Sequence, residues 1–411
     1  MVLVKKTFIV IPIEPQLKQS VEEYEQDIDS YRNYITENKI ADINKGNTAN
    51  KLPHSEAMRE STLSVNTDGA ATFRSTTKKP LYPIFVVLNN LPPSLRFSKQ
   101  NLMLAGLWLS KGEPNSNILF KNFCMEMKKL QTGININNSI YTVFLLQNCL
   151  DSVGCKVRCN KQFNGVYGCT FCLHPGESID NARCYPGKSV ADRDDASTRV
   201  LMDEVHRTGK EKLGIVGKSV FMSIPNFDIV SGFPTDYMHA VLLGVMKQLW
   251  SLWVDSVNHK ENFYVGLRLT EIEERFLSFR PPSSFPRFPK PLTEYKQFKA
   301  NEWEGILLHY IFHMMYGILP SEYLNHVMLL SFTIFQLLQP DLRDINLCGR
   351  RLEHFGKQFQ VLYGHQNMTY NVHLTAQHLI EAVHNFGALY NFSLFPFEAG
   401  IFIFILYLNS K

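Results

Sequence analysis

The stretch ESTLSVNTDGAATF at residues 60–73 decides the fold, because it has the pattern of a strand that ends on an acid. Polar and apolar side chains alternate from Thr62 to Asn66, and this period of two, with β-forming residues, predicts a strand. Asp68 and Gly69 then end the pattern. An acid in this place either caps a turn or belongs to a site at the edge of a sheet.

Three further strands and one helix are predicted after this stretch. The strands are Leu81–Leu88, Leu102–Leu109 and Ile140–Gln147, and the helix is Ile118–Leu130. In this β-β-β-α-β order a helical crossover brings the fourth strand beside the first, as at the start of an RNase H-like fold. Asp68 and Asp151 then lie side by side at one sheet end. A divalent cation such as Mg²⁺ relieves the repulsion between two such carboxylates, although both acids also suit ordinary strand ends.

Composition narrows the class of protein. The chain has 411 residues, of which 45% are hydrophobic, and a net charge of +4. The length and the hydrophobic content suffice for a large core in two or three subdomains. A net charge this small does not by itself indicate a nucleic-acid partner. The sequence contains no uninterrupted run of about 18 apolar residues, so no membrane-spanning helix is expected. The first residues do not resemble a signal peptide. Eight cysteines without a secretion signal favour metal ligands over a disulfide framework.

A cysteine cluster follows the fourth predicted strand. Cys169 and Cys172 form a CxxC, and two thiolates at this spacing can hold one tetrahedral zinc ion. Cys155 and Cys159 precede them, so these four cysteines could also form a local site. A redox pair would need a thioredoxin-like context, which is missing, and buried cysteines that bind nothing are the remaining interpretation.

Six longer motifs resemble one known family. They are NTDGAATF, LNNLPPSLRFSKQNLMLAGLWLSKGEPN, FNGVYGCTFCLHPGE, FPTDYMHAVLLGV, MTYNVHL and FPFE. In this order they resemble the transposase domain of CACTA (En/Spm-like) elements and the animal transposase-domain proteins of that group. The layout is also similar to that of the V(D)J recombinase catalytic core. The resemblance implies a DDE-type transposase, with an RNase H-like core interrupted by a large all-α insertion.

The resemblance also implies three catalytic acids that hold Mg²⁺ or Mn²⁺. Asp68 and Asp151 match the two aspartates of the family. Glu398 matches the glutamate of the family. It follows His378, the second histidine of a pair that the family also has, by twenty residues, which is where the third acid is expected. Glu302, which opens a predicted helix, is the rival third acid. The implied chemistry is DNA strand cleavage and transfer by in-line displacement with two metal ions.

A structural zinc site is the second implication. In the family a CxxC and two histidines separated by four residues hold zinc, and Cys169, Cys172, His373 and His378 fit this pattern. The zinc would staple the end of the insertion to the core. Asp236 and His239 match a D-x-x-H of the family, for which a core or DNA-end role is expected and not a metal.

The expected fold class is therefore mixed α/β, with a zinc-stapled RNase H-like core in several parts. The parts are residues 1–59 (N-terminal segment and linker), 60–175 (first part of the core with the CxxC), 176–235 (loop or linker), 236–370 (helical insertion) and 371–411 (histidine-pair helix and C-terminal acid). Transposon-end DNA, a nuclear location and a homodimer follow from the resemblance, and no membrane is expected.

Two departures from the family keep further functions open. The tail AGIFIFILYLNSK is apolar where a polar and basic helix is usual, and residues 1–59 contain no basic or Cys/His-rich recognition module. A catalytically inactive transposase-derived protein that binds DNA or protein is the main alternative. A helical interaction protein without any metal is the third hypothesis.

Overall fold

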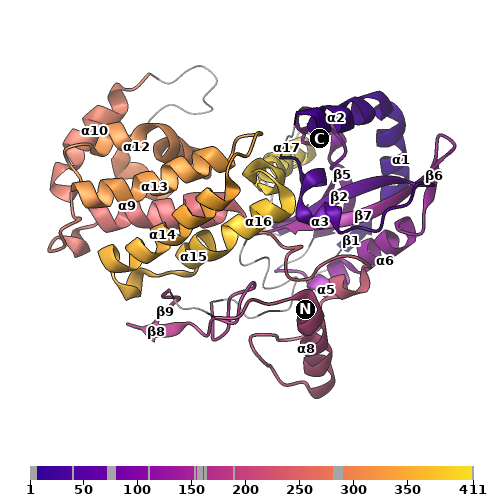
Figure 1. Ribbon diagram of the computed structural model, residues 1–411, viewed down its shortest axis with the longest axis horizontal. Coiled ribbons are helices and arrows are strands. Elements are labelled where there is room, and N and C mark those ends of the chain that lie inside the picture. Colours follow the sequence, from indigo (N-terminus) through magenta and orange to yellow (C-terminus); the bar gives the residue numbers. More distant parts are fainter. Residues whose placement is uncertain are drawn as a thin grey trace. The chain divides into compact units, whose positions relative to one another are not determined.

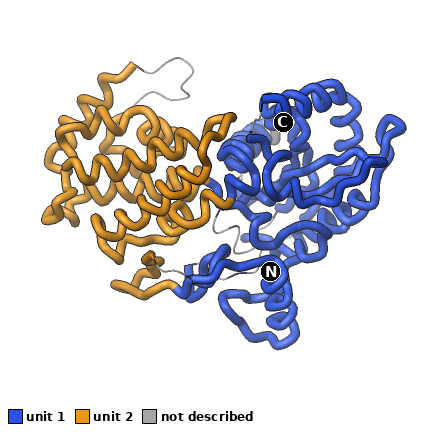
Figure 2. Tube along the Cα trace, in the orientation of Figure 1, with its two compact units in different colours: residues 1–175, 190–236, 382–411 blue, residues 176–189, 237–381 orange. Residues whose placement is uncertain are grey.

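The computed structural model describes residues 7–38, 41–71, 80–109, 112–151, 154, 161, 164–187, 190–280 and 290–409. The chain divides into two compact units (Figure 2). The first comprises Met1–Pro175, Val190–Asp236 and Ala382–Lys411, and the second comprises Gly176–Ser189 and Tyr237–Glu381. The protein is mixed α/β, as predicted. Among the described helices, none has the length and apolar character needed to cross a bilayer.

A mixed seven-stranded sheet lies at the centre of the first unit (Figure 1). Its strand order is β1-β5-β4-β2-β7-β6, and the short β3 pairs with β4. The strands are β1 (Thr7–Val10), β2 (Arg59–Thr67), β3 (Ala70–Ala71), β4 (Pro80–Leu88), β5 (Met103–Leu109), β6 (Ile134–Ile136) and β7 (Ser139–Cys149). Only the β2–β7 pair in this sheet is parallel among the described strands. The predicted β-β-β-α-β order is confirmed, with the fourth predicted strand beside the first.

A helical crossover makes the parallel pair possible, because parallel neighbours cannot be joined by a tight turn. It consists of α5 (Ser116–Leu119) and α6 (Lys121–Leu130). Phe123 and Met127 of α6 are buried four residues apart, as expected for the inner face of an amphipathic helix. They share one hydrophobic core with Leu63 of β2 and with side chains of α1 (Ile13–Glu23), which precedes α2 (Glu25–Glu37).

On the opposite face of the sheet, β2 carries the polar residues Thr62, Ser64 and Asn66, because alternation turns every second residue of the strand away from that core. Ser64 donates from Oγ to Oδ1 of Asn89 at 2.9 Å. Gln147 of β7 donates from Nε2 to Ser64 Oγ at 3.0 Å and to the carbonyl of Asn391 at 2.9 Å. The C-terminal segment is therefore held to this face by hydrogen bonds.

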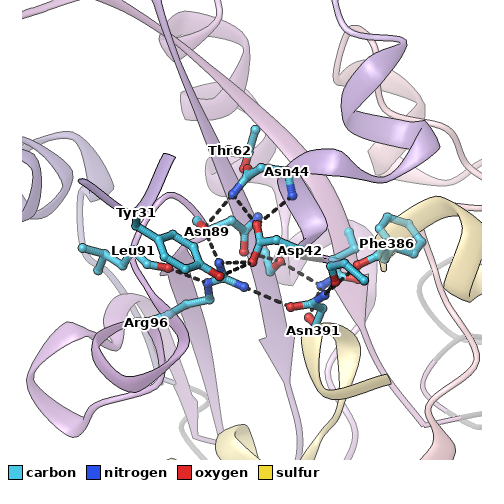
Figure 3. A network of polar contacts seen from close by, with 12 residues as sticks. Tyr31, Asp42, Asn44, Thr62, Asn89, Leu91, Arg96, Phe386 and Asn391 are labelled. Atoms are coloured by element: carbon cyan, nitrogen blue, oxygen red, sulfur yellow. Dashed lines mark hydrogen bonds and ion pairs between the residues drawn. The ribbon is translucent and has the colours of Figure 1, made fainter. Parts of the chain in front are cut away.

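A buried ion pair is the centre of this polar layer (Figure 3). Arg96 Nη2 lies 2.7 Å from Asp42 Oδ2, and both side chains are 0% exposed. Arg96 also donates from Nη1 to Asn391 Oδ1 at 3.2 Å and from Nε to the carbonyl of Leu91 at 3.0 Å. Tyr31 donates its hydroxyl to Asp42 at 2.9 Å, and burial followed by the charge of Asp42 raises the pKa of this tyrosine, so the hydroxyl remains a donor. The network joins segments from both ends of the chain.

One helix of the first unit lies in the segment 176–235, for which the sequence predicts a loop or linker. This helix, α8 (Asp195–Thr208), begins where Asp194 accepts a hydrogen bond from the Ser197 amide at 2.9 Å. It ends at Gly209, which has a φ of 67°. Both are ordinary helix-end signals, an Asp N-cap and a left-handed glycine, so the prediction of a loop was wrong here.

The second unit is helical apart from a short hairpin, β8 (Glu177–Ile179) and β9 (Ala182–Cys184). Its α-helices are α9 (Lys247–Val254), α10 (Leu269–Ser278), α11 (Ala300–Gly305), α12 (Ile311–Met315), α13 (Ser321–Leu337), α14 (Ile345–Tyr363) and α15 (Tyr370–His373). Three π-helical segments interrupt them, namely η4 (Met238–Met246), η8 (Ile306–Tyr310) and η10 (Leu374–His378). The chain then continues through α16 (Leu379–Phe386) and α17 (Phe395–Asn409).

Candidate metal centre and strand-end acids

Four buried side chains form a candidate metal centre. The donor atoms of Cys169, Cys172, His373 and His378 all lie within 4.8 Å of one another. Two thiols and two imidazoles are the donor set of tetrahedral structural zinc sites, whereas Mg²⁺ prefers oxygen. Within the described part of the chain, no second such group of His, Cys, Asp and Glu occurs. These four residues therefore fit a zinc-like ion.

The two histidines meet because the helix that carries them contains a π-helical turn. In a regular α-helix, residues five apart point about 140° away from each other. The i→i+5 hydrogen bonding of η10 widens the turn, so that His378 comes to lie over His373. Their Nε2 atoms are 3.2 Å apart. A tetrahedral zinc with Zn–N bonds of about 2.0–2.1 Å would separate two nitrogens by about 3.3 Å, close to this distance.

A buried arginine supports the CxxC turn. Arg193, which is 8% exposed, donates from Nε to the carbonyls of Cys169 at 3.1 Å and Cys172 at 3.2 Å. Its Nη2 donates to the carbonyls of Tyr167 at 3.1 Å and Leu213 at 2.8 Å. The sequence does not predict this role, because a single arginine in a polar segment has no local pattern that indicates it. Groups that hold metal ligands in place in this way contribute to metal affinity.

The surroundings of Cys172 favour its neutral thiol when no cation is bound. A hydrogen bond with Cys169, and then burial, raise the pKa of the Cys172 thiol. A positive ion at the centre would act in the opposite direction and favour the thiolate, which is the form that binds metals. The four-cysteine site considered above involves Cys155 and Cys159, which lie outside the described residues.

Asp68 and Asp151 follow the last residues of the parallel pair. The β2–β7 register ends with Asn66 opposite Cys149, and each aspartate stands two positions further along its strand direction. Asp68 is exposed and accepts a hydrogen bond from the Gly69 amide at 2.6 Å. Asp151 is half-buried. Both acids thus lie at the same edge of the sheet.

An irregularity in β7 sets the phase of these two acids. Leu63 is opposite Leu145, but the next residue, Ser64, is opposite Gln147, so that Leu146 is skipped. Residues opposite each other in neighbouring strands point to the same face of the sheet. Because Leu146 is skipped, Gln147 and Cys149 point to the same face of the sheet as Ser64 and Asn66. Without this extra residue they would point to the other face. Bulges often change the direction of a side chain in this way.

Glu398 lies in the first turn of α17 and is exposed. The helix packs on the face of the sheet that carries Asn66, because Phe404 contacts Phe85 with ring centroids 6.0 Å apart, and Phe85 is opposite Asn66. Phe397 likewise contacts Phe97 at 6.3 Å. The three predicted catalytic acids therefore all belong to the first unit, two at a strand end and one on a helix that covers the face of Asn66.

The rival acid Glu302 has structural partners. It accepts a hydrogen bond from the Lys299 amide at 2.8 Å at the start of α11, and Lys290 lies 2.8 Å from its other oxygen. Asp236 is buried and accepts a hydrogen bond from the Leu394 amide at 3.0 Å. His239 is half-buried in η4.

Comparison with the models of known protein families finds no match for this chain, and a search among curated proteins finds no similar sequence.

Proposed function

We propose that this protein is a transposase-derived DNA strand-transfer protein of the CACTA type, with an RNase H-like catalytic core. The observation that supports the proposal most is the parallel β2–β7 pair, which ends at Asn66 and Cys149 and leaves Asp68 and Asp151 at one sheet edge. A helix that carries Glu398 packs on the face to which Asn66 belongs. Two carboxylates at one strand end, with a third on a helix over the same face, are the residue types that bind divalent cations.

In this proposal the three acids bind the divalent cations that catalyse an in-line phosphodiester displacement. Asp68 and Asp151 would supply hard oxygen ligands, and Glu398 would complete the site. Bound Mg²⁺ or Mn²⁺ supplies activation of the attacking water or 3′-hydroxyl and stabilisation of the leaving oxygen. The DNA substrate would be a transposon end, in the nucleus, with the protein acting as a homodimer.

Zinc has a structural part in the proposal. Cys169, Cys172, His373 and His378 would supply four ligands, which fill a tetrahedral shell and leave no position for a reacting water. A closed site of this kind contributes to folding and not to the reaction itself. Zinc at this position would staple the helical part of the chain to the core.

Nicking of supercoiled plasmid DNA in Mn²⁺ or Mg²⁺ tests the catalytic proposal. Asp68→Asn and Asp151→Asn are expected to lower the nicking rate by about 10²–10³-fold, because each removes a charge that acts on the transition state. Asp180→Asn is the matched control, since Asp180 lies in the β8–β9 turn at a φ of 49° that asparagine also adopts. Glu398→Gln is expected to be inactive and Glu302→Gln active. Nicking that persists in Asp68→Asn would refute the catalytic assignment.

The second candidate function is a catalytically inactive protein that binds DNA or a protein partner. The apolar character of α17 favours it, because Phe402 is 54% exposed and Leu406 is 48% exposed where the family has polar and basic residues. In this case the zinc-loaded wild type would retain DNA in a salt-dependent gel-shift assay, or bind a protein partner, without any cation-dependent nicking.

A further inference from the structure

We infer that Asp236 is a positioning residue, which holds the beginning of α17 at the end of β7 and thereby sets the place of Glu398. The inference deepens the proposed function and rests on it for the chemical role of Glu398. The contacts that carry it all lie in the first unit, between the end of β7, the segment before Asp236 and the N-terminal end of α17.

The carboxylate of Asp236 accepts a hydrogen bond from the residue that precedes α17. Its side chain is 4% exposed, and Oδ1 accepts a hydrogen bond from the Leu394 amide at 3.0 Å. Amides at the start of a helix have no partner within the helix, so an outside acceptor is needed. An ionised carboxylate is costly to bury, and charge-assisted hydrogen bonds to amides at a positive helix end offset part of that cost.

The backbone next to Asp236 is attached to the end of β7. Asn148 donates its amide to the carbonyl of Gly232 at 2.8 Å, and Thr235 forms a parallel bridge with Leu150. Asp151 directly follows Leu150, and Asp236 directly follows Thr235, so the two aspartates come right after the two bridged residues. The strand that leads to Asp151 also fixes the backbone of Asp236.

The same helix start carries Glu398. The amide of Glu398 donates to the carbonyl of Leu394 at 2.9 Å, so Leu394 is bonded to Asp236 through its amide and to Glu398 through its carbonyl. A shift of Leu394 would move Glu398 with respect to Asp151. Misplacement of a reacting group by about 1 Å can lower a rate by about 10²-fold. Asp236 thus acts through Glu398 without touching substrate.

Two substitutions separate the acceptor from the charge. Asp236→Ala removes the acceptor, whereas Asp236→Asn keeps an oxygen that the Leu394 amide can reach. Asp228→Ala is the matched control, because Asp228 lies in the same segment and accepts hydrogen bonds from the nearby amides of Val230 and Ser231, both at 2.8 Å. All variants would be studied as the zinc-loaded full chain.

Three measurements are made on each variant. They are hydrogen exchange of the amides in 394–398 other than Pro396, Mn²⁺ affinity by electron paramagnetic resonance, and plasmid nicking. Asp236→Ala is expected to exchange faster at these amides and to bind Mn²⁺ about tenfold more weakly, with nicking lowered by about 10²-fold. The Mn²⁺ affinity of Asp236→Asn is expected to stay within about threefold of that of the wild type, because the asparagine oxygen still accepts the hydrogen bond. The Mn²⁺ affinity of Asp228→Ala is expected to equal that of the wild type.

The outcomes separate this inference from the proposed function. Unchanged Mn²⁺ affinity in Asp236→Ala, a wild type that binds no Mn²⁺, or an equal loss in Asp228→Ala would each overturn the positioning role. A wild type that binds Mn²⁺ with the expected dependence on Asp236, but does not nick DNA, would refute the proposed activity and support the positioning role.

Discussion

The Nε2 atoms of His373 and His378 lie 3.2 Å apart although five positions separate the residues in the chain. This geometry depends on the π-helical segment η10, since an α-helix would direct the two rings to different faces. The stacked ring of Tyr185, with its centroid 5.4 Å from that of His373, supports one side of the pair. Two imidazoles so arranged are ready to share one ion.

Zinc content is the first prediction. The wild type is expected to bind one equivalent of zinc, and Cys172→Ser to lose it, because a hydroxyl is a poor substitute for a thiolate ligand. The matched control is Cys184→Ser, whose buried thiol donates to the carbonyl of Gln366 at 3.2 Å, as a hydroxyl also can. Elemental analysis after dialysis against a weak chelator measures the result. Full zinc content in Cys172→Ser would contradict the assignment.

Arg193 is expected to matter for zinc affinity although it is not a ligand. Arg193→Met removes donors to the carbonyls of Cys169 and Cys172, so the two thiols are less well positioned. The expected loss is about 10–100-fold in zinc affinity, as for other residues that hold ligands in place. Competition with a chromogenic chelator measures it. Arg183→Met in β9, at an arginine of the short hairpin, serves as control and should bind zinc like the wild type.

The Arg96–Asp42 pair is expected to be a major source of stability in the first unit. Arg96→Met leaves a buried carboxylate without its cation, which costs about 3–5 kcal/mol. The double variant Arg96→Met/Asp42→Asn is expected to recover part of this loss, because no uncompensated charge remains. Urea unfolding, followed by circular dichroism, gives these differences.

An exposed pair provides the control for this experiment. Lys129 is 70% exposed and lies 2.8 Å from Glu14, so Lys129→Met is expected to leave the stability of the protein unchanged. If Arg96→Met were as stable as Lys129→Met, the buried pair would have no special energetic role.

His326 predicts a pH dependence of stability in the second unit. Burial lowers the pKa of this histidine to about 4, and its ring lies flat on Phe355, with centroids 4.3 Å apart. The neutral ring is favoured when folded, so the contribution of His326 is complete above about pH 6.5 and is lost as the pH falls towards 4. The loss amounts to about 3 kcal/mol over this range.

Substitution by glutamine isolates this effect. His326→Gln does not titrate and keeps a donor for the carbonyl of Phe355, which the histidine reaches from Nε2 at 3.0 Å. The free energy of unfolding in urea, followed by tryptophan fluorescence, should therefore fall less steeply between pH 6.5 and 4.5 than in the wild type. His259→Gln, at an exposed histidine, should follow the wild type. Equal slopes for all three proteins would exclude His326 as the cause.

The order of strands and helices could be predicted because it depends on neighbouring residues. Alternation in Thr62–Asn66 and the helical period within Ile118–Leu130 reflect which side chains face a core, and both segments have the predicted structure. The loop prediction for 176–235 was wrong at α8, whose two ends carry local signals, the Asp194 N-cap and the left-handed Gly209. The role of Arg193 could not be predicted, because its partners are backbone carbonyls, which leave no trace in the residue types.

By itself, the sequence determined which chemical groups are present. It contains two thiols in a CxxC, two imidazoles with four residues between them, and acids that follow predicted strands. Only the tertiary structure decided how these groups face one another. The π-helical turn aligns His373 with His378, and the skipped Leu146 puts later residues of β7 in phase with Ser64. The first depends on i→i+5 hydrogen bonds within the helix and the second on pairing between two strands distant in the chain, and no simple period of apolar residues encodes either feature.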